Sequence, residues 1–271
     1  MKMATRSRRA QQDAAHTLKK LIALIVVALV IVSGVAFYVH QSSVPPLDKL
    51  TLCPAEGPRG QYTLLVDKTD PLNFTQKAAF MVTLRDLIER RVPPGYLVSV
   101  FVLGEDFKAT AEPLIELCNP GTGADRSELN SNLKRLRAQY ESKFLEPMLK
   151  QSESMISTQA SQSSPIFEML QLVAINGFRK HDIKGERRLV ILSDMLHNTP
   201  QFSMYKGTVD FEQFSASDYG RKAQSELRSV DVELHYLMNA PKLQTKRNLK
   251  FWEDYFNKAG ARIVEVRPLE G

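Results

Sequence analysis

The sequence predicts an α/β fold with a doubly wound, mostly parallel sheet of six strands. Two observations predict the strands: apolar runs at residues 62–66 and 187–192 each lead into an aspartate, Asp67 and Asp194. Such runs are typical of strands buried on both faces, as in a parallel sheet. A third observation predicts the helices, because segments with helical spacing alternate with the apolar runs along the chain.

The charge of the chain is concentrated at its start. Residues 1–20 carry a net charge of +5, so only +1 of the total of +6 belongs to the rest. A basic surface that binds nucleic acid would need its charge on the folded body. We therefore interpret residues 1–20 as a basic cytoplasmic tail and expect no nucleic-acid binding.

Residues 21–39 are apolar throughout and lack a formal charge. About 20 apolar helical residues span the hydrocarbon core of a bilayer, whereas the apolar region of a cleavable signal peptide usually has about 7–15 residues. We therefore predict a single-pass transmembrane helix and keep a signal peptide as the alternative. The basic tail places the N-terminus in the cytoplasm. The domain then lies outside the cytoplasmic (inner) membrane, in the periplasm of a Gram-negative cell.

Residues 40–60 are rich in Ser, Pro and Gly and lack apolar periodicity, which is typical of a stalk. The folded domain is then expected over residues 61–271. Cys53 and Cys118 are the two cysteines of the chain. An oxidising compartment permits a disulfide between them, and two unrelated buried thiols are the alternative.

The remaining elements follow in order. After Asp67 comes an amphipathic helix over residues 74–88, and then a second apolar strand at 96–103. A weaker strand at 112–118 contains Pro113, which suits the edge of a sheet. A helical insertion at about 125–160 bears one apolar stripe: Leu129, Leu133, Leu136, Tyr140, Phe144 and Met148. The stripe favours packing against the sheet, with a partner surface as the alternative. A helix from Pro165, strands at 187–194, 232–238 and 261–266, and a helix at 248–258 complete the pattern.

This order of parts, over residues 61–266, resembles the von Willebrand factor A (vWA) family, one of the Rossmann-like folds. That family carries a metal-ion-dependent adhesion site with an Asp-x-Ser-x-Ser turn after the first strand, a Thr or Ser at a middle helix, and an Asp after the fourth strand. The corresponding segments are Asp67-Lys68-Thr69-Asp70-Pro71, Ser163-Ser164-Pro165 and Ser193-Asp194. Pro71 departs from the pattern, because it stands in place of the second hydroxyl.

The resemblance implies that Asp67, Thr69, Ser164 and Asp194 hold a divalent metal, with Asp70 compensating for Pro71. Carboxylate and hydroxyl oxygens are suitable ligands for Mg²⁺, and Mn²⁺ and Ca²⁺ are the alternatives. It also implies a protein partner whose acidic side chain completes the coordination. In the competing interpretation, Asp67 and Asp194 only cap the turns that follow them, and the metal site is vestigial.

The segment after Asp194 is rich in aromatic residues. We predict that Phe202, Tyr205, Phe211 and Phe214 face a partner, since aromatic side chains on a loop beside a site are suited to binding. The alternative is that they fold under the loop and hold it in place. His197 is interpreted as an isolated surface histidine.

No catalytic arrangement stands out, and we expect no enzyme. Phosphatases of the haloacid dehalogenase type need a second Asp two residues after the first, where this chain has Thr69. The sequence therefore favours a membrane-anchored, extracytoplasmic protein-binding module of the vWA type. A structural subunit of an envelope, secretion, conjugation or defence assembly is the alternative, and a metal-dependent hydrolase is the least favoured.

Overall fold

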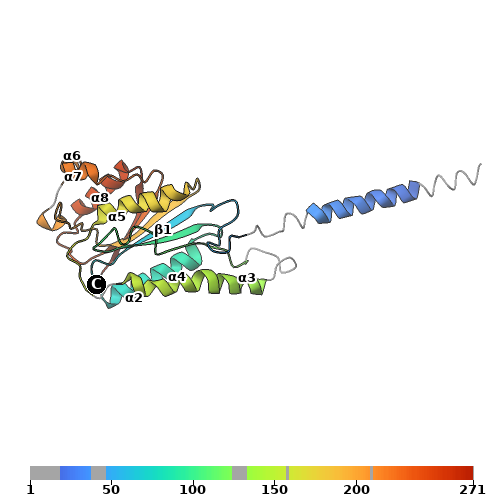
Figure 1. The fold of residues 1–271 in the computed structure, drawn as a ribbon, viewed down its shortest axis with the longest axis horizontal. Coiled ribbons are helices and arrows are strands. Elements are labelled where there is room, and N and C mark those ends of the chain that lie inside the picture. The colour runs from blue at the N-terminus through green and yellow to red at the C-terminus, as the bar shows by residue number, and fades with distance from the viewer. Residues whose placement is uncertain (1–18, 38–46, 124–132, 157–158, 208–209, 271) are drawn as a thin grey trace, which may run out of the picture. The chain divides into compact units, whose positions relative to one another are not determined.

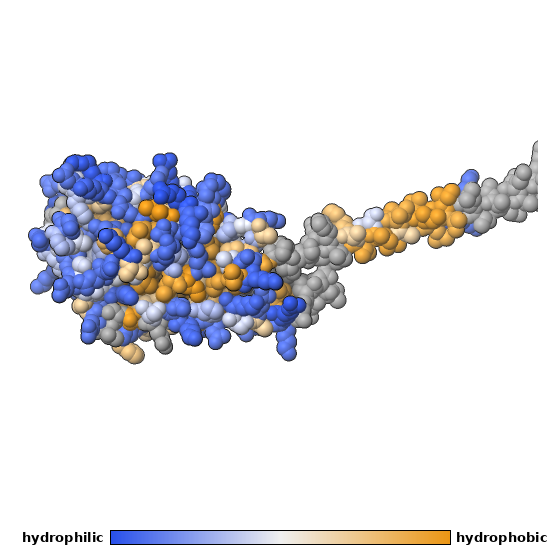
Figure 2. Space-filling view, in the orientation of Figure 1, coloured by the Kyte–Doolittle hydropathy of each residue, from blue (hydrophilic) through white to orange (hydrophobic). Residues whose placement is uncertain are grey.

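The computed structural model describes residues 19–37, 47–123, 133–156, 159–207 and 210–270. Contacts within the chain divide it into two units, Met1–Pro45 and Pro46–Gly271. In the first unit, the helix Lys19–Phe37 has a mean hydropathy of 2.7. It is apolar over the side visible in Figure 2. Across the parts of the chain that the structure describes, it is the one helix whose length and composition suit a membrane span.

The second unit is built on a six-stranded sheet with the order β3-β2-β1-β4-β5-β6. The strands are β1 (Gln61–Asp67), β2 (Leu97–Leu103), β3 (Ile115–Cys118), β4 (Arg187–Ser193), β5 (Asp231–Leu237) and β6 (Arg262–Leu269). All neighbours pair in parallel except β2 and β3, which are antiparallel. The predicted α/β fold class is confirmed, with the Pro113 segment leading into the antiparallel edge strand.

Helices cover both faces of the sheet (Figure 1). One face holds α2 (Phe74–Asp86) with its π-helical extension Leu87–Arg91, then α3 (Leu133–Tyr140) and α4 (Glu146–Lys150). The other holds α5 (Ile166–Leu172) with its extension Val173–Arg179, then α6 (Phe211–Ala216), α7 (Asp218–Lys222) and α8 (Lys246–Lys258). Along β1, β2, β4 and β5, alternate residues enter one or the other core, since successive side chains of a strand point to opposite faces.

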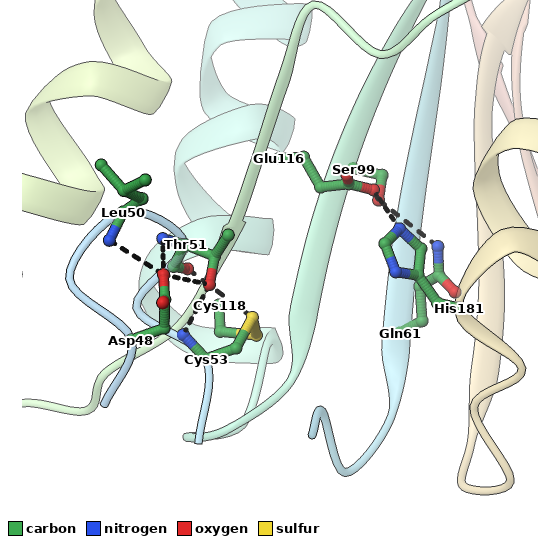
Figure 3. Close-up of a disulfide and its surroundings, with 9 residues drawn as sticks. All are labelled: Asp48, Leu50, Thr51, Cys53, Gln61, Ser99, Glu116, Cys118 and His181. Atoms are coloured by element: carbon green, nitrogen blue, oxygen red, sulfur yellow. Dashed lines mark hydrogen bonds and ion pairs between the residues drawn. A yellow bond between two sulfur atoms is a disulfide. The ribbon is translucent and has the colours of Figure 1, made fainter. Parts of the chain in front are cut away.

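The prediction that residues 40–60 form a stalk is wrong from Leu47 onward, where the chain is part of the folded domain. Leu52 is 2% exposed and packs in the core beneath α2, and Cys53 forms a disulfide with Cys118 of β3. Figure 3 shows the local cause: the Asp48 carboxylate accepts hydrogen bonds from the backbone of Leu50 and Thr51, which closes a turn. The Cys118 N–H then donates to the Thr51 carbonyl at 2.8 Å. Residues 40–46 lie outside the described part of the chain.

The predicted helical insertion is a layer of the core. Tyr140, Phe144 and Met148 are buried with strand and α2 residues in one cluster. Leu133 and Leu136 are half-buried, and Leu129 lies outside the described residues. The stripe therefore packs against the sheet, and its buried part is not available as a partner surface.

Candidate functional site

The sequence-predicted site residues come together where β1 and β4 lie side by side. From β1 the chain passes to α2 on one face of the sheet, and from β4 it passes to α6 and α7 on the other. The connections therefore diverge between these two neighbouring parallel strands. In open α/β sheets, ligands bind in the crevice at the carboxyl ends of the strands at such a switch point. Asp67 ends β1 and Asp194 directly follows β4.

Asp67 is 4% exposed and accepts three hydrogen bonds. Its Oδ1 accepts from the Thr69 hydroxyl at 2.6 Å and from the Thr69 N–H at 2.9 Å. Its Oδ2 accepts from the Ser193 hydroxyl at 2.7 Å. Ser193 belongs to the segment Ser193-Asp194 named from the sequence, but it was not predicted as a site residue. Its signal was present, because it is a hydroxyl that ends an apolar strand directly before Asp194.

Asp194 is 3% exposed and uses only part of its hydrogen-bonding capacity. Its Oδ1 accepts from the Leu196 N–H at 2.9 Å. Its Oδ2 is buried and has no hydrogen bond of ordinary geometry, although the Tyr205 hydroxyl and the Asp70 carboxyl lie near the Asp194 side chain. The turn that follows Asp194 is held by the backbone conformation of Met195 and by a hydrogen bond to its carbonyl. Met195 adopts a left-handed backbone conformation with φ 54°, and the Trp252 indole N–H donates to its carbonyl at 2.8 Å.

Ser164 reaches the same edge of the sheet from the segment before α5. Its backbone exchanges two hydrogen bonds with Asn198, at 2.7 and 3.0 Å. Nearby, the Ser161 N–H donates to the Thr69 carbonyl at 2.7 Å. These bonds fasten the segment between the turns that carry Thr69 and Asp194. The Ser164 hydroxyl is buried and, like Asp194 Oδ2, has no hydrogen-bond partner.

Burial and neighbouring carboxyl groups raise the pKa of both buried aspartates of the site. Burial raises the pKa of Asp194 well above its ordinary value, and the charges of Asp67 and Asp70 raise it further. Burial also raises the pKa of Asp67, against the lowering effect of its hydrogen bonds from Ser193 and Thr69. The Tyr205 hydroxyl has its pKa raised by burial and then by Asp194. The site therefore concentrates acidic groups where little water can reach them.

A divalent cation fits this donor set. Two buried oxygens without partners, on Asp194 and Ser164, lie at the same edge as the Asp67 carboxylate and the Thr69 hydroxyl. Hard oxygen donors of this kind suit Mg²⁺ and Ca²⁺. Within the described ranges, no cluster of three or more His, Cys, Asp or Glu is arranged to hold a metal. A metal at this edge would therefore depend on the hydroxyl groups as well as on the carboxylates.

The predicted aromatic partner surface needs correction. Phe214 is 2% exposed and stacks on Phe167 with 4.8 Å between ring centroids. Phe202 and Phe211 are half-buried against the same core. Helices α6 and α7 fold this segment onto α5 and α8, which draws the phenylalanine rings inward. Tyr205 alone among the four is exposed, at 47%.

The interpretation of His197 as a surface residue is wrong. Its side chain is fully buried, and its Nε2 lies 3.2 Å from the Thr199 hydroxyl and 3.0 Å from the Tyr219 hydroxyl. Burial lowers the pKa of His197 to about 3, so the ring is neutral at physiological pH. Its role is to fill the core behind the Asp194 turn.

A serine of β2 and a glutamate of β3 also meet a histidine that follows the extension of α5 (Figure 3). Glu116 lies between the other two: its Oε1 accepts from the Ser99 hydroxyl at 2.9 Å and lies 2.6 Å from His181 Nε2. A serine nucleophile needs the imidazole beside its hydroxyl, with the carboxylate behind. The order found is different, so this network lacks the arrangement of a hydrolytic triad.

These observations define a doubly wound α/β domain with acidic and hydroxyl groups gathered at its switch point, on a chain that also has a helix of membrane-spanning length. No protein-family model matches the chain, and no curated protein matches it. Among solved structures, the chain is similar to an aerotolerance-related membrane protein from Bacteroides fragilis NCTC 9343, crystallised with multiple mutations to serines. The identity is 12% and the TM-score 0.31, over 78% of this chain and 91% of that one. At this level of similarity the neighbour does not indicate a function for the chain. The functional interpretation therefore rests on the strand order and on the residues of the site.

Proposed function

We propose that the protein is a membrane-anchored, extracytoplasmic module of the vWA type that binds a protein partner through a divalent cation. The observation that carries the proposal is the pair of buried oxygens without partners, Asp194 Oδ2 and Ser164 Oγ, beside the Asp67 carboxylate. A buried polar group without a hydrogen bond costs about 1–3 kcal/mol, more for a charged group. A cation bound among these atoms would remove that cost.

In this proposal Asp67 and Asp194 supply the charge that holds the ion, and Thr69 and Ser164 supply hydroxyl oxygens. Asp70 is half-buried beside them and contributes to the raised pKa of Asp194, which supports its role in place of the hydroxyl missing at Pro71. An acidic side chain of the partner would complete the coordination. Mg²⁺ is the preferred ion on this donor set, with Mn²⁺ and Ca²⁺ as alternatives. No reaction is assigned to the site.

The placement outside the cytoplasmic membrane has two supports. The helix Lys19–Phe37 has suitable length and composition to anchor the chain, and the basic residues before it favour an N-terminus in the cytoplasm. The Cys53–Cys118 disulfide is the second support, since such bonds persist in oxidising compartments such as the periplasm.

The proposal is tested by Mn²⁺ titration of the purified full chain, with free Mn²⁺ followed by its electron paramagnetic resonance signal. We expect one bound Mn²⁺ per chain, displaced by excess Mg²⁺, and loss of binding in Asp194→Asn. Asp182→Asn is the matched control, because the Asp182 side chain is 77% exposed and precedes β4 at the opposite end of that strand. Equal Mn²⁺ binding by the wild type and Asp194→Asn would overturn the proposal.

A second candidate is a structural subunit of a larger envelope assembly whose metal site is vestigial. One observation favours it: both oxygens of Asp67 already accept hydrogen bonds, from Thr69 and Ser193. Bonds of this kind stabilise the turn without a metal. The same titration separates the candidates, because a vestigial site would leave the Mn²⁺ signal unchanged at millimolar protein and metal.

A further inference from the structure

The outer edge of β6 is a second surface with a defined chemistry. β6 has eight residues and ends the sheet beside β5, and no strand in the described part of the chain pairs with its other side. The Leu269 carbonyl accepts from the Met238 N–H at 3.0 Å, so it points toward β5. Backbone groups alternate in direction along a strand. Val266 and Pro268 therefore direct their backbone groups away from the sheet.

Pro268 limits what can pair with this edge. It has no N–H, and it occupies one of the outward positions where a donor would otherwise be free. Val266 retains both its N–H and its carbonyl at an outward position. An added strand would therefore make its hydrogen bonds around Val266. This excludes Pro268 as the centre of a regular pairing and leaves Val266 as the candidate centre in the regular part of β6.

The sequence of β6 is complementary to itself around Val266. When a second copy is laid antiparallel with the two Val266 residues opposite each other, Glu265 faces Arg267 of the other copy. A bulge at Val264, where the pairing with β5 skips one residue of β6, limits the regular pairing to the residues from Glu265 onward. A shift by two residues in either direction would place Glu265 opposite Glu265, or Arg267 opposite Arg267. The central register is the one that sets opposite charges face to face.

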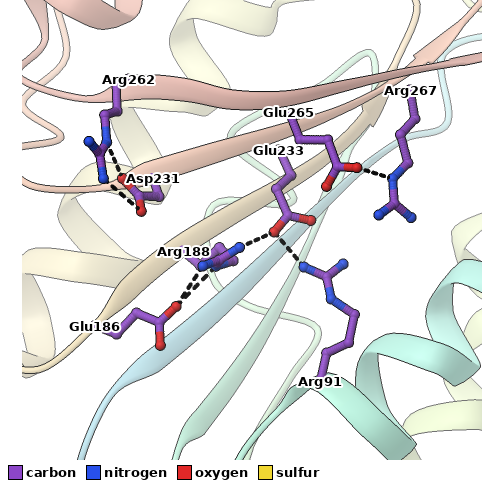
Figure 4. A network of polar contacts seen from close by, with 8 residues as sticks. All are labelled: Arg91, Glu186, Arg188, Asp231, Glu233, Arg262, Glu265 and Arg267. Carbon is purple, nitrogen blue, oxygen red and sulfur yellow. Dashed lines mark hydrogen bonds and ion pairs between the residues drawn. The ribbon is translucent and has the colours of Figure 1, made fainter.

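The charged side chains are placed to make these contacts. Within one chain, Arg267 Nε lies 2.5 Å from Glu265 Oε1, and the two side chains are 50% and 39% exposed. Figure 4 shows both on the face of β5 and β6 that carries Glu233, with their ion pair separate from the buried Glu233 network. Val266 points to the other face and packs on the core beside α8. A second copy would thus meet two accessible, opposite charges without disturbing the core.

We propose that β6 is a homodimerisation edge that pairs antiparallel with β6 of a second copy, centred on Val266. This inference does not rest on the metal site. One strand edge buries far less than the roughly 1,200 Å² of a standard stable interface, so the dimer is weak in dilute solution. Anchoring both copies in one membrane raises their effective concentration. The pairing is therefore expected on membranes rather than in dilute detergent.

Disulfide trapping of the full chain in proteoliposomes tests the register. Glu265→Cys and Arg267→Cys chains are reconstituted together, and each is also reconstituted alone. In the proposed dimer residues 265 and 267 form a pair without backbone hydrogen bonds, with Cα atoms about 4.5 Å apart, within the range for a disulfide. The native cysteines are bonded to each other and do not compete. We expect several-fold more dimer in the mixture than in either variant alone.

Equal trapping in all three samples would show random collision, and no trapping would show that the edge stays unpaired. Preferential trapping of Glu265→Cys alone would show another register. Each of these results overturns the proposal, as does a crosslink to another protein in place of a second copy.

A charge exchange gives an independent readout, the fraction of dimer in proteoliposomes by energy transfer between labelled copies. Arg267→Glu should abolish the transfer, because it sets four carboxylates around Val266. The double variant Glu265→Arg, Arg267→Glu should restore it, since each residue again faces its opposite. These side chains are half-exposed, so the variants keep the fold. Loss in both variants would contradict the pairing.

Discussion

At the scale of single residues, the two unpartnered oxygens of Asp194 and Ser164 decide what the site can be. Their turns are strongly fixed, by Trp252 on one side and Asn198 on the other. If Asp194 only capped the turn that follows it, its Oδ1 would be sufficient, because this oxygen accepts from the Leu196 N–H. Capping would not explain why Oδ2 is also buried. The pattern of Asp, Thr, Ser and Asp could be predicted from the sequence. Ser193 stands at a strand end in the sequence, but its contact with Asp67 could not be predicted, because only the pairing of β4 with β1 brings its hydroxyl to that carboxylate.

Asp194→Asn should stabilise the metal-free protein at neutral pH. Burial and Asp67 raise the pKa of Asp194 in the folded state, so the folded state binds more protons than the unfolded state above the ordinary value of 3.8. The free energy of unfolding therefore falls as the pH rises through that window. Each unit of raised pKa corresponds to about 1.4 kcal/mol. Asn keeps the acceptor for Leu196 and carries no charge.

The measurement is thermal unfolding in chelator between pH 5 and 8, as the difference between the variant and the wild type. The difference should grow with pH. His197 makes the unfolding free energy rise with pH, because burial lowers its pKa to about 3. This contribution is the same in the variant and the wild type, so it cancels in the difference between them. A variant that is less stable than the wild type at pH 8 would show that the Asp194 charge is compensated in the metal-free protein.

Glu233→Gln should cost about 3–5 kcal/mol of unfolding free energy, as expected when one partner leaves a buried ion pair. The Glu233 side chain is 1% exposed and pairs with Arg91 and Arg188 (Figure 4). Burial alone would raise its pKa, but the hydrogen bonds from the two arginines outweigh burial and lower it. Its contribution is thus present above the ordinary pKa of 4.5 and is lost as the pH falls through the folded-state pKa.

Urea unfolding at pH 7 measures this loss, and Glu265→Gln is the matched control on the same face. Glu265 is 39% exposed in its pair with Arg267, so its loss should cost about 0–1 kcal/mol. Equal costs for the two variants would contradict the assignment of Glu233 as a buried anchor.

At the scale of elements, apolar runs were enough to predict the buried strands β1, β2 and β4, since runs too apolar for a wet face must be buried in the sheet. The half-exposed edge strands β3 and β6 have weaker patterns and were predicted with different bounds. These patterns did not predict that residues 47–60 belong to the domain. That segment is held by the Asp48 turn and the Cys53–Cys118 bond, and neither leaves a periodic signal. The aromatic segment after Asp194 was predicted as a loop because α6 and α7 are short, at six and five residues.

Removing the disulfide should destabilise the domain. Cys53 and Cys118 are separated by 65 residues in sequence, and closing a loop of that size stabilises by about 4 kcal/mol in the chain-entropy description. We expect the Cys53→Ala, Cys118→Ala double variant to lose about 2–4 kcal/mol in urea unfolding. The wild type under reducing conditions should match it. An unchanged midpoint would mean that residues 47–60 dock without help from the bond.

The helical layer α3–α4 should behave as core. Phe144 is fully buried against the sheet and α2, so Phe144→Ala should cost about 3–5 kcal/mol. The neighbouring Lys143 is exposed, and Lys143→Ala should change the unfolding free energy by less than about 0.5 kcal/mol. Urea unfolding compares the two. If Phe144→Ala kept full stability and lost only partner binding, the stripe would be an interface after all.

At the scale of the whole molecule, the strand order of the sheet determines which side chains meet at the candidate site. Strand order 3-2-1-4-5-6 makes β1 and β4 neighbours although about 120 residues separate them in sequence. That adjacency brings Asp67 and Asp194 to one edge, as expected from their positions at the ends of two neighbouring strands. The metal-binding role of these two residues with Thr69 and Ser164 is a proposal. The aromatic partner surface could not be predicted, because which rings turn inward depends on how α6 and α7 pack on Phe167.

The most direct measurement is thermal unfolding of the purified full chain in detergent, with chelator and with saturating Mg²⁺, beside the Asp67→Asn, Asp194→Asn double variant. Binding at about 100 times the dissociation constant adds roughly 2.7 kcal/mol to the stability of the folded state. We predict a rise of the unfolding midpoint with Mg²⁺ in the wild type and none in the double variant. The same midpoint with and without Mg²⁺ in the wild type would contradict a metal-binding role for this edge and leave it as a structural remnant.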